Sequence, residues 1–187
     1  MKVHSDPSSS EELAGMEPWE AMLWLSRAYL EASEALCQAM LEGDFSFQYS
    51  SSRVVLHLAR QGIELFLKGA IAAHGEAPEK LGHNLNKLHR EYRRLYPELR
   101  FYFEVPRQFL VSLNEELFPD DTDLFHRELD QRHGYAADRR GTSFATSEVF
   151  DPAMMKEELG ELRRVSQIIE WTELRPYLNT MLGRAGS

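Results

Sequence analysis

Arg127 and His133 are the two residues of this sequence whose side chains and spacing suggest a reaction at a phosphate group. Five residues separate them, which places them about two turns apart if the segment is helical. An imidazole can move a proton to or from a 2′-hydroxyl or a leaving oxygen, and a guanidinium can hold a phosphate and offset its charge. The pair could therefore cleave RNA without a metal. The alternative interpretation is a solvated helix end that runs into a loop, where this spacing is common.

Other kinds of catalytic site lack their motifs in this sequence. It has no phosphate-binding glycine loop, no GxSxG, no HExxH and no paired CxxC, which argues against most nucleotide hydrolases, serine hydrolases and zinc sites. His126 and Asp130 have the i, i+4 spacing of a ligand pair, but no third ligand lies within reach in the sequence. Cys37 is the only cysteine, so it forms no internal disulfide. We expect neither a metal nor a cofactor.

Length and composition indicate a globular protein with one core. The chain has 187 residues, of which 43% are hydrophobic and 27% charged, with a net charge of −9. Such an acidic chain is a poor candidate for coating duplex DNA, which needs many phosphate contacts. The sequence shows neither an apolar run long enough for a membrane span nor a secretory signal, so we expect a cytoplasmic protein. Residues 1–15 are expected to form a flexible leader and residues 16–187 a single helical domain.

Hydrophobic periodicity predicts an all-α fold, an up-and-down bundle of about five helices. No alternation long enough to build a sheet is present, although residues 101–105 are compatible with a short strand or an extended segment. A long loop over residues 132–150 precedes the last helix, which Pro176 should kink and Gly183 should end. The expected helices cover residues 18–42, 53–73, 84–96, 106–117, 123–131 and 152–183.

Two of these helices carry informative faces. The second is apolar around much of its circumference, so we expect it at the centre, with the preceding serines as caps. The third has a basic outer face that contains Lys87, Arg90, Arg93 and Arg94. The inner stripe expected for the first helix is Met22, Leu25, Tyr29, Ala32, Leu36 and Ala39, widened by Leu23, Leu30, Cys37 and Met40.

The stretch from His57 to Leu88 resembles the HEPN domain (higher eukaryotes and prokaryotes nucleotide-binding). This family shows a helix with an alanine, an E-x-x-L-K core and small residues, then a glycine-bearing turn and a proline…(G)H-(D/N)-L…L start to the next helix. The first part is matched by Ala59, Glu64, Leu67, Lys68, Gly69 and Ala70. The second part is matched by Gly75, Pro78, Gly82, His83, Asn84, Leu85 and Leu88.

The resemblance implies an α-helical bundle, commonly a homodimer with a cleft between subunits. Many HEPN proteins are metal-independent endoribonucleases whose signature is an arginine and a histidine with four to six residues between them, which Arg127 and His133 fit. Glu128 follows the arginine, whereas many catalytic members have Asn, Asp or His there. Non-catalytic members often act beside a nucleotidyltransferase and carry an RYP-like motif, for which Arg132 and Tyr135 are the distant candidates.

Three functions remain open on these grounds. The favoured one is a non-catalytic HEPN-like module that binds RNA, a nucleotide or a nucleotidyltransferase-type partner. The second is a metal-independent endoribonuclease of the toxin or defence type, with an antitoxin as partner, and the third is a structural dimerisation protein. Glu64 and Lys68 are interpreted as an ion pair on a half-buried helix, and His83 as fixing the turn before the third helix, while Asn84 is noted as a residue of the family motif. The candidate ligand-binding residues are Lys87, Arg90, Arg94, Arg132 and Tyr135.

Overall fold

The computed structural model describes residues 10–110, 124–126 and 150–185. Within these residues the chain is all-α and contains no strand, which confirms the predicted class. The helices are α1 (Pro18–Glu42), α2 (Gln48–Ala73), α3 (Leu85–Leu95), α5 (Pro152–Ile168) and α6 (Arg175–Ala185). Short 3₁₀ helices lie at Ser10–Leu13, Pro78–Leu81, Leu99–Phe101 and Arg107–Phe109. None of the described helices is long and apolar enough to cross a membrane.

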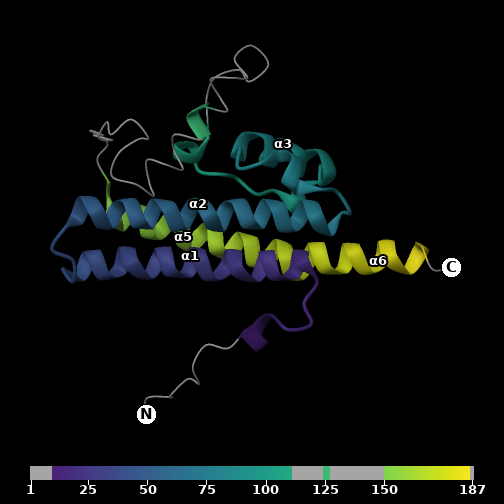
Figure 1. Ribbon diagram of the computed structural model, residues 1–187, viewed down its shortest axis with the longest axis horizontal. Helices are drawn as coiled ribbons and strands as arrows, with labels where there is room; N and C mark the ends of the chain where they lie inside the picture. Colours follow the sequence, from purple (N-terminus) through teal and green to yellow (C-terminus); the bar gives the residue numbers. More distant parts are fainter. Residues whose placement is uncertain (1–9, 111–123, 127–149, 186–187) are drawn as a thin grey trace.

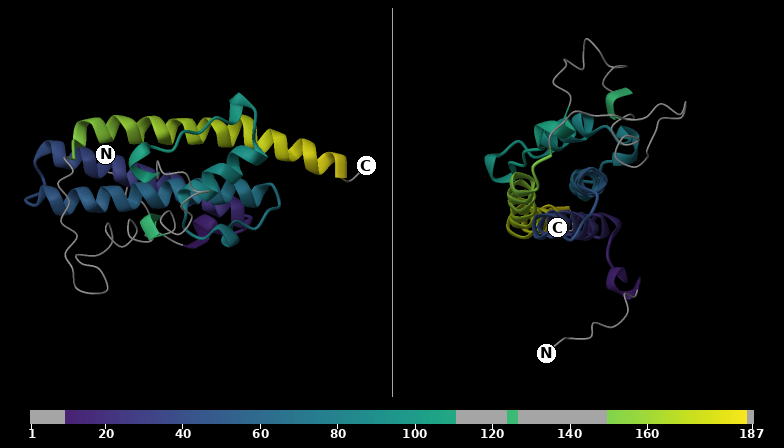
Figure 2. Two further views of the ribbon diagram at one scale, coloured as in Figure 1. Left: turned by 90° about the horizontal axis from the view of Figure 1, so that it is seen from above. Right: turned by 90° about the vertical axis from the view of Figure 1, so that its left-hand side faces the viewer.

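Among the long helices, α1 packs against both α2 and α5, and α3 packs on α2 (Figure 1). α1 and α2 run in opposite directions because a short connection joins their neighbouring ends. α5 continues through a π-helix into α6, and the resulting rod extends past the end of the bundle (Figure 2). The predicted loop over residues 132–150 lies outside the described residues except for its last residue, as do most of the helices predicted over 106–117 and 123–131.

Local signals in the sequence set most of the helix ends. Pro18 occupies the first turn of α1, and Gly43 ends that helix with φ +83°, a conformation that favours glycine. The Asn84 side chain accepts a hydrogen bond from the Lys87 amide and so caps α3. Asp151 caps α5 in the same way, directly before Pro152. These boundaries confirm the predictions made from the sequence.

The start of α2 differs from the prediction. The helix begins at Gln48, so the serines that were expected to cap it lie inside its first turns. Ser51 Oγ donates to the Phe47 carbonyl over 2.9 Å, and Ser52 Oγ donates to the Tyr49 carbonyl over 2.7 Å. Serines can satisfy their hydroxyls by bonding back to the preceding turn, so they need not stop a helix.

The centre of the inner stripe of α1 lies one position further along the chain than predicted, on four residues that were expected to widen the stripe and on two serines. The buried residues are Leu23, Ser26, Leu30, Ser33, Cys37 and Met40. Leu25, which was expected inside, is exposed. Ser26 and Ser33 make the sequence of this stripe look partly polar. Both side chains are nevertheless buried, because their hydroxyls donate hydrogen bonds to carbonyls of α2. Ser26 donates to the Gly62 carbonyl over 2.7 Å, and Ser33 donates to the Val55 carbonyl over 3.1 Å.

Two glycines let α1 and α2 approach closely. A Cβ added to Gly62 would lie 2.8 Å from Leu30 Cγ and 3.2 Å from the Ser26 carbonyl oxygen. At Gly69 an added Cβ would lie 2.9 Å from Leu23 Cδ2 and 3.1 Å from a backbone oxygen of α1. The helix pair is therefore held by interlocked leucines and by hydrogen bonds from serine hydroxyls to backbone carbonyls.

Aromatic side chains fill the space between α2, α3 and residues 101–105. Phe101 ends a 3₁₀ helix and residues 102–105 are extended, but they pair with no strand in the described part of the chain. The Phe103 and Phe66 rings have centroids 4.3 Å apart. Tyr92 donates its hydroxyl to the Phe101 carbonyl over 2.6 Å, and burial raises the pKa of that hydroxyl. This layer fixes the extended segment against α2 and α3.

The last helix neither breaks at Pro176 nor ends at Gly183. A π-helix, Ile169–Leu174, precedes the proline, and α6 then runs on to Ala185. Proline has no amide hydrogen and crowds the preceding turn, so a wider turn accommodates it without breaking the rod. The predicted kink thus takes the form of a local change in helical pitch.

Candidate functional site

Glu64 lies at the centre of a polar cluster where α2 meets the start of α3. Its carboxylate is 2.8 Å from Lys68 Nζ, 2.8 Å from His83 Nδ1 and 3.4 Å from Arg60 Nη1. Arg60 and Lys68 lie one turn before and one turn after Glu64, so all three line one face of α2. Glu64 is 4% exposed and Arg60 is completely buried. Three groups that can carry positive charge therefore share contacts with the Glu64 carboxylate.

The cluster also holds the turn that leads into α3. Arg60 Nη2 donates to the His83 carbonyl over 2.7 Å, while the His83 ring contacts Glu64. The next residue, Asn84, is buried and caps α3. The residues singled out by the family resemblance, Glu64, Lys68, His83 and Asn84, thus lie together. Their contacts are those of a structural anchor, since the Glu64 oxygens are already occupied by hydrogen bonds and ion pairs.

Three of the basic residues predicted to bind a ligand lie along α3, which begins directly after this cluster. Lys87 lies in the first turn, and Arg90 and Arg94 lie on the same face in the next two turns. Arg94 is exposed and forms a two-pronged ion pair with Glu91, with contacts of 2.6 Å and 2.8 Å. Its charge is therefore balanced locally, and Lys87 is the member of this face that lies nearest in sequence to the Glu64 cluster.

A second segment meets α3 at the same end. Residues 124–126 are helical, and the His126 ring nitrogen Nε2 lies 2.8 Å from Asn86 Oδ1 in the first turn of α3. His126 is 2% exposed, so this contact is buried. The residue that immediately precedes Arg127 in the sequence is therefore fixed beside the start of α3.

Four of the predicted site residues cannot be placed on this framework. Arg127, Arg132, His133 and Tyr135 lie outside the described residues. The predicted pairing of Arg127 with His133 accordingly stays a prediction, and so does the binding role of Arg132 and Tyr135. The described part of the candidate site consists of the Glu64 cluster, the first turn of α3 and the contact to His126.

His89 lies on the side of α3 that faces the extended segment, and the pKa of its imidazole is lowered. Its Nε2 donates to the Phe103 carbonyl over 2.9 Å. Burial lowers the pKa of the imidazole, the carbonyl raises it in part, and the nearby Arg93 charge lowers it further. His89 is accordingly neutral in the folded protein at physiological pH.

We expect this histidine to make the protein less stable in mild acid. Its contribution is present above the pKa of the unfolded chain, about 6.5, and is lost as the pH falls through the lower folded-state pKa. Urea unfolding at pH 7.5 and pH 5 should therefore show a smaller free energy of unfolding at pH 5, and His89→Gln should reduce that difference. NMR titration gives the pKa directly, and a value above 6.5 for His89 would contradict the prediction.

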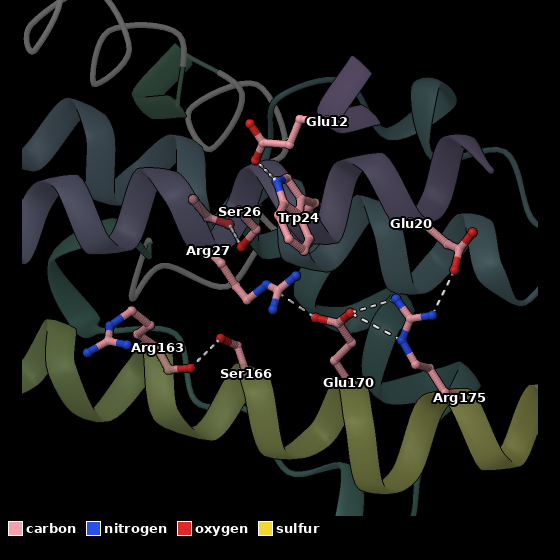
Figure 3. A network of polar contacts seen from close by, with 10 residues as sticks. Glu12, Glu20, Trp24, Ser26, Arg27, Arg163, Ser166, Glu170 and Arg175 are labelled. Carbon is pink, nitrogen blue, oxygen red and sulfur yellow. Dashed lines mark hydrogen bonds and ion pairs between the residues drawn. The ribbon is translucent and has the colours of Figure 1, made fainter. Parts of the chain in front are cut away.

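A second polar network joins α1 to the π-helix (Figure 3). Glu170 is 2% exposed, and it accepts hydrogen bonds from Arg175 Nη2 at 2.9 Å and lies 3.7 Å from Arg27 Nε. Arg175 also donates to Glu20 over 2.7 Å, and this bond together with the Glu17 amide lowers the pKa of Glu20. Two arginines thus balance two glutamates, and the network ties the rod to α1.

All three tryptophans of the chain surround this network. The Arg27 guanidinium lies 4.4 Å from the centroid of the Trp24 ring, and the Arg175 guanidinium lies 4.3 Å from that of Trp171 and 5.5 Å from that of Trp19. Cation–π contacts of this kind stabilise a helix interface. The charges of the network balance and tryptophan rings pack around it. Its geometry is therefore that of a structural contact between two helices.

Sequence reasoning missed Arg60 and the Glu170 network. Arg60 stands four residues before Glu64, and this i, i+4 spacing is the signal that could have found it. No such signal exists for Glu170, because Arg27 and Glu20 come from a distant helix. Among the described residues, no three His, Cys, Asp or Glu side chains gather closely enough to hold a metal. Comparisons with protein-family models, with curated proteins and with solved structures find no significant match to this chain.

Proposed function

We propose that this chain is a HEPN-like helical module that binds the phosphate groups of RNA or of a nucleotide without cleaving them. The observation that carries the proposal is the cluster at the junction of α2 and α3, where Arg60, Lys68 and His83 surround the carboxylate of Glu64. Lys87 and the amides of the first turn of α3 lie next to this cluster. A helix start with adjacent cations favours an anion, even in a chain whose net charge is −9.

The contacts of the cluster support binding rather than catalysis. A general base needs a carboxylate or imidazole that can reach the substrate, but Glu64 is nearly buried and bonded on both oxygens. The His83 side chain is 69% exposed, but its Nδ1 is engaged with that carboxylate. Glu128 beside Arg127 departs from the residues found in catalytic HEPN proteins and supports the same interpretation.

An RNA-binding measurement on charge-reversal variants tests the proposal. The probe is a fluorescently labelled single-stranded RNA of about 20 nucleotides, titrated with the full chain at low salt in excess chelator. We expect Lys87→Glu with Arg90→Glu to weaken binding ~10-fold or more, because phosphate contacts dominate such affinities. Fluorescence anisotropy gives the affinities, and the slope against salt concentration should fall in the double variant.

Arg164→Glu with Arg163→Glu is the matched control, because these arginines lie on α5, remote from α3 in the chain and each paired with a glutamate. The control should bind RNA within ~2-fold of the unaltered protein if the α3 face makes the phosphate contacts. Equal losses of RNA affinity in the two double variants would show that the total charge of the protein alone governs binding. No binding of RNA, ATP or GTP by the unaltered protein would overturn the proposal.

The endoribonuclease remains the second candidate, favoured by one observation. The contact between His126 and Asn86 fixes the start of the segment that contains Arg127 and His133 beside α3. A ribonuclease would need its arginine and histidine near a surface that holds phosphate. Cleavage of cellular RNA in excess chelator by the unaltered protein, lost in His133→Ala, would establish this function in place of the non-catalytic one.

A further inference from the structure

A groove runs between the segment Tyr102–Gln108 and the outer side of α5. Its volume is about 650 Å³, which is within the range of sites that hold several side chains or a small molecule. The lining residues are Tyr102, Glu104, Pro106, Arg107, Gln108, Glu158, Glu161, Leu162 and Val165. The groove uses none of the residues of the Glu64 cluster and none of the three tryptophans, so it is a separate feature of the surface.

The floor of the groove is apolar. Leu162 and Val165 come from successive turns of α5, and Pro106 faces them from the extended segment. Tyr102 forms part of the wall and is 49% exposed. Ile168, one turn beyond Val165 on α5, is also exposed, so apolar surface continues past the end of the groove. A partner that covered this strip would gain hydrophobic burial.

The rim of the groove is acidic. It carries Glu104, Glu158 and Glu161 against a single cation, Arg107. Glu161 is paired with Arg164 at 2.6 Å. No ion pair joins Glu104 or Glu158 to a cation among the residues that the structure describes. Their partners are neutral: the Tyr102 hydroxyl donates to Glu104 over 3.2 Å, and the Gln108 amide donates to Glu158 over 3.1 Å.

Both walls of the groove are fixed before any partner binds. Gln108 bridges from the extended segment to Glu158 on α5, and it also lies 3.8 Å from Met155 Sδ. On the other side, His89 of α3 holds the Phe103 carbonyl, and the Phe103 ring is fully buried. A preformed groove costs little conformational entropy on binding, which favours affinity.

We propose that this groove docks a cationic amphipathic segment of a protein partner. Apolar side chains of the segment contact Pro106, Leu162 and Val165, and its lysines or arginines pair with Glu104 and Glu158. The charge of the rim decides the class of partner: a nucleic acid would be repelled by it, and a second copy of this chain also carries a net charge of −9. The pattern of an apolar floor with like charges along the rim is the one used to bind an amphipathic helix.

The test uses the full chain, labelled with ¹⁵N, and a model peptide. The probe is a capped peptide of about 14 residues with leucines at i, i+3, i+4 and i+7 and lysines elsewhere. We expect saturable NMR shift changes at residues 102–108 and 158–168. A peptide of the same composition with its leucines scattered around the helix should bind ~10-fold more weakly, because it cannot cover the apolar floor. Shift changes confined to α3 or to the tryptophans would overturn the proposal.

Two adjacent glutamates of α5 supply matched variants. Glu158 lines the groove, whereas Glu157 is exposed on the neighbouring face and contributes nothing to the lining. Glu158→Lys should weaken peptide binding ~5-fold or more and Glu157→Lys less than ~2-fold, although both change the net charge equally. Val165→Gln tests the floor without altering charge, and it should also weaken binding. Circular dichroism and urea midpoints check that each variant is folded.

The remaining outcomes identify other occupants and would each overturn the proposal. Equal losses in Glu158→Lys and Glu157→Lys would show general attraction between opposite charges. Full displacement of the peptide by an equimolar amount of spermine would show that the groove takes a bare polycation. If the NMR signals of the groove residues shift when the protein is diluted without peptide, a second copy of this chain occupies the groove. None of these outcomes depends on whether the chain binds RNA.

Discussion

Replacing Glu64 by glutamine is expected to destabilise the protein by about 3–5 kcal/mol, because it removes one partner of a buried ion pair. Glutamine has the same shape, so the variant removes the charge of the carboxylate that the fully buried Arg60 contacts. Lys68 and His83 lose the same partner. Urea denaturation followed by circular dichroism measures the loss of unfolding free energy.

Glu161→Gln is the matched control for this prediction. Glu161 also pairs with an arginine of its own helix, at 2.6 Å, but both side chains are exposed. An exposed pair contributes about 1 kcal/mol or less, so the control should unfold close to the unaltered protein. Equal effects at Glu64 and Glu161 would contradict the anchoring role of the cluster. Replacing Arg60 and Glu64 together by Met and Leu should recover much of the loss, because no buried charge then remains unpaired.

Gly62→Ala is expected to destabilise the protein by about 1–3 kcal/mol, against the ordinary preference of helices for alanine. The added methyl carbon would lie 2.8 Å from Leu30 Cγ and 3.2 Å from the Ser26 carbonyl oxygen. The leucine can change rotamer, but the backbone oxygen can move only if α1 moves with it. The hydrogen bond from Ser26 to the Gly62 carbonyl would then lengthen as well.

Gly160 provides a control whose replacement by alanine is expected to change stability in the opposite direction. It lies in α5, where an added Cβ would meet only Glu34 Oε1 at 3.4 Å, an ordinary contact with a flexible side chain. Gly160→Ala should therefore stabilise the protein by about 0.5–1 kcal/mol through its effect on helix propensity. Each kcal/mol shifts the melting temperature of a chain this size by roughly 2–4 °C, so scanning calorimetry resolves both signs. A stabilised Gly62→Ala would contradict the close packing of α1 on α2.

Parts of the candidate site followed from the sequence, and others did not. The motif residues Glu64, Lys68, His83 and Asn84 were recognised together, and the structure brings them to one junction. Arg60 escaped notice because an arginine in the middle of a helix is ordinarily exposed, whereas here it is buried and donates to the turn before α3. The groove beside α5 could not be foreseen, because its two walls come from segments that are far apart in the chain.

By itself the sequence determined the helical class and most helix ends. Gly43, Asn84, Asp151 and Pro152 act on their own backbone or on the next turn, so their effects can be read locally. Only the tertiary structure decided which face of α1 is buried. A serine counts as polar in any pattern, yet Ser26 becomes a core residue when a glycine on another helix brings an acceptor within reach. Burial of a polar group depends on a partner across space, and that partner is not encoded in the residues beside it.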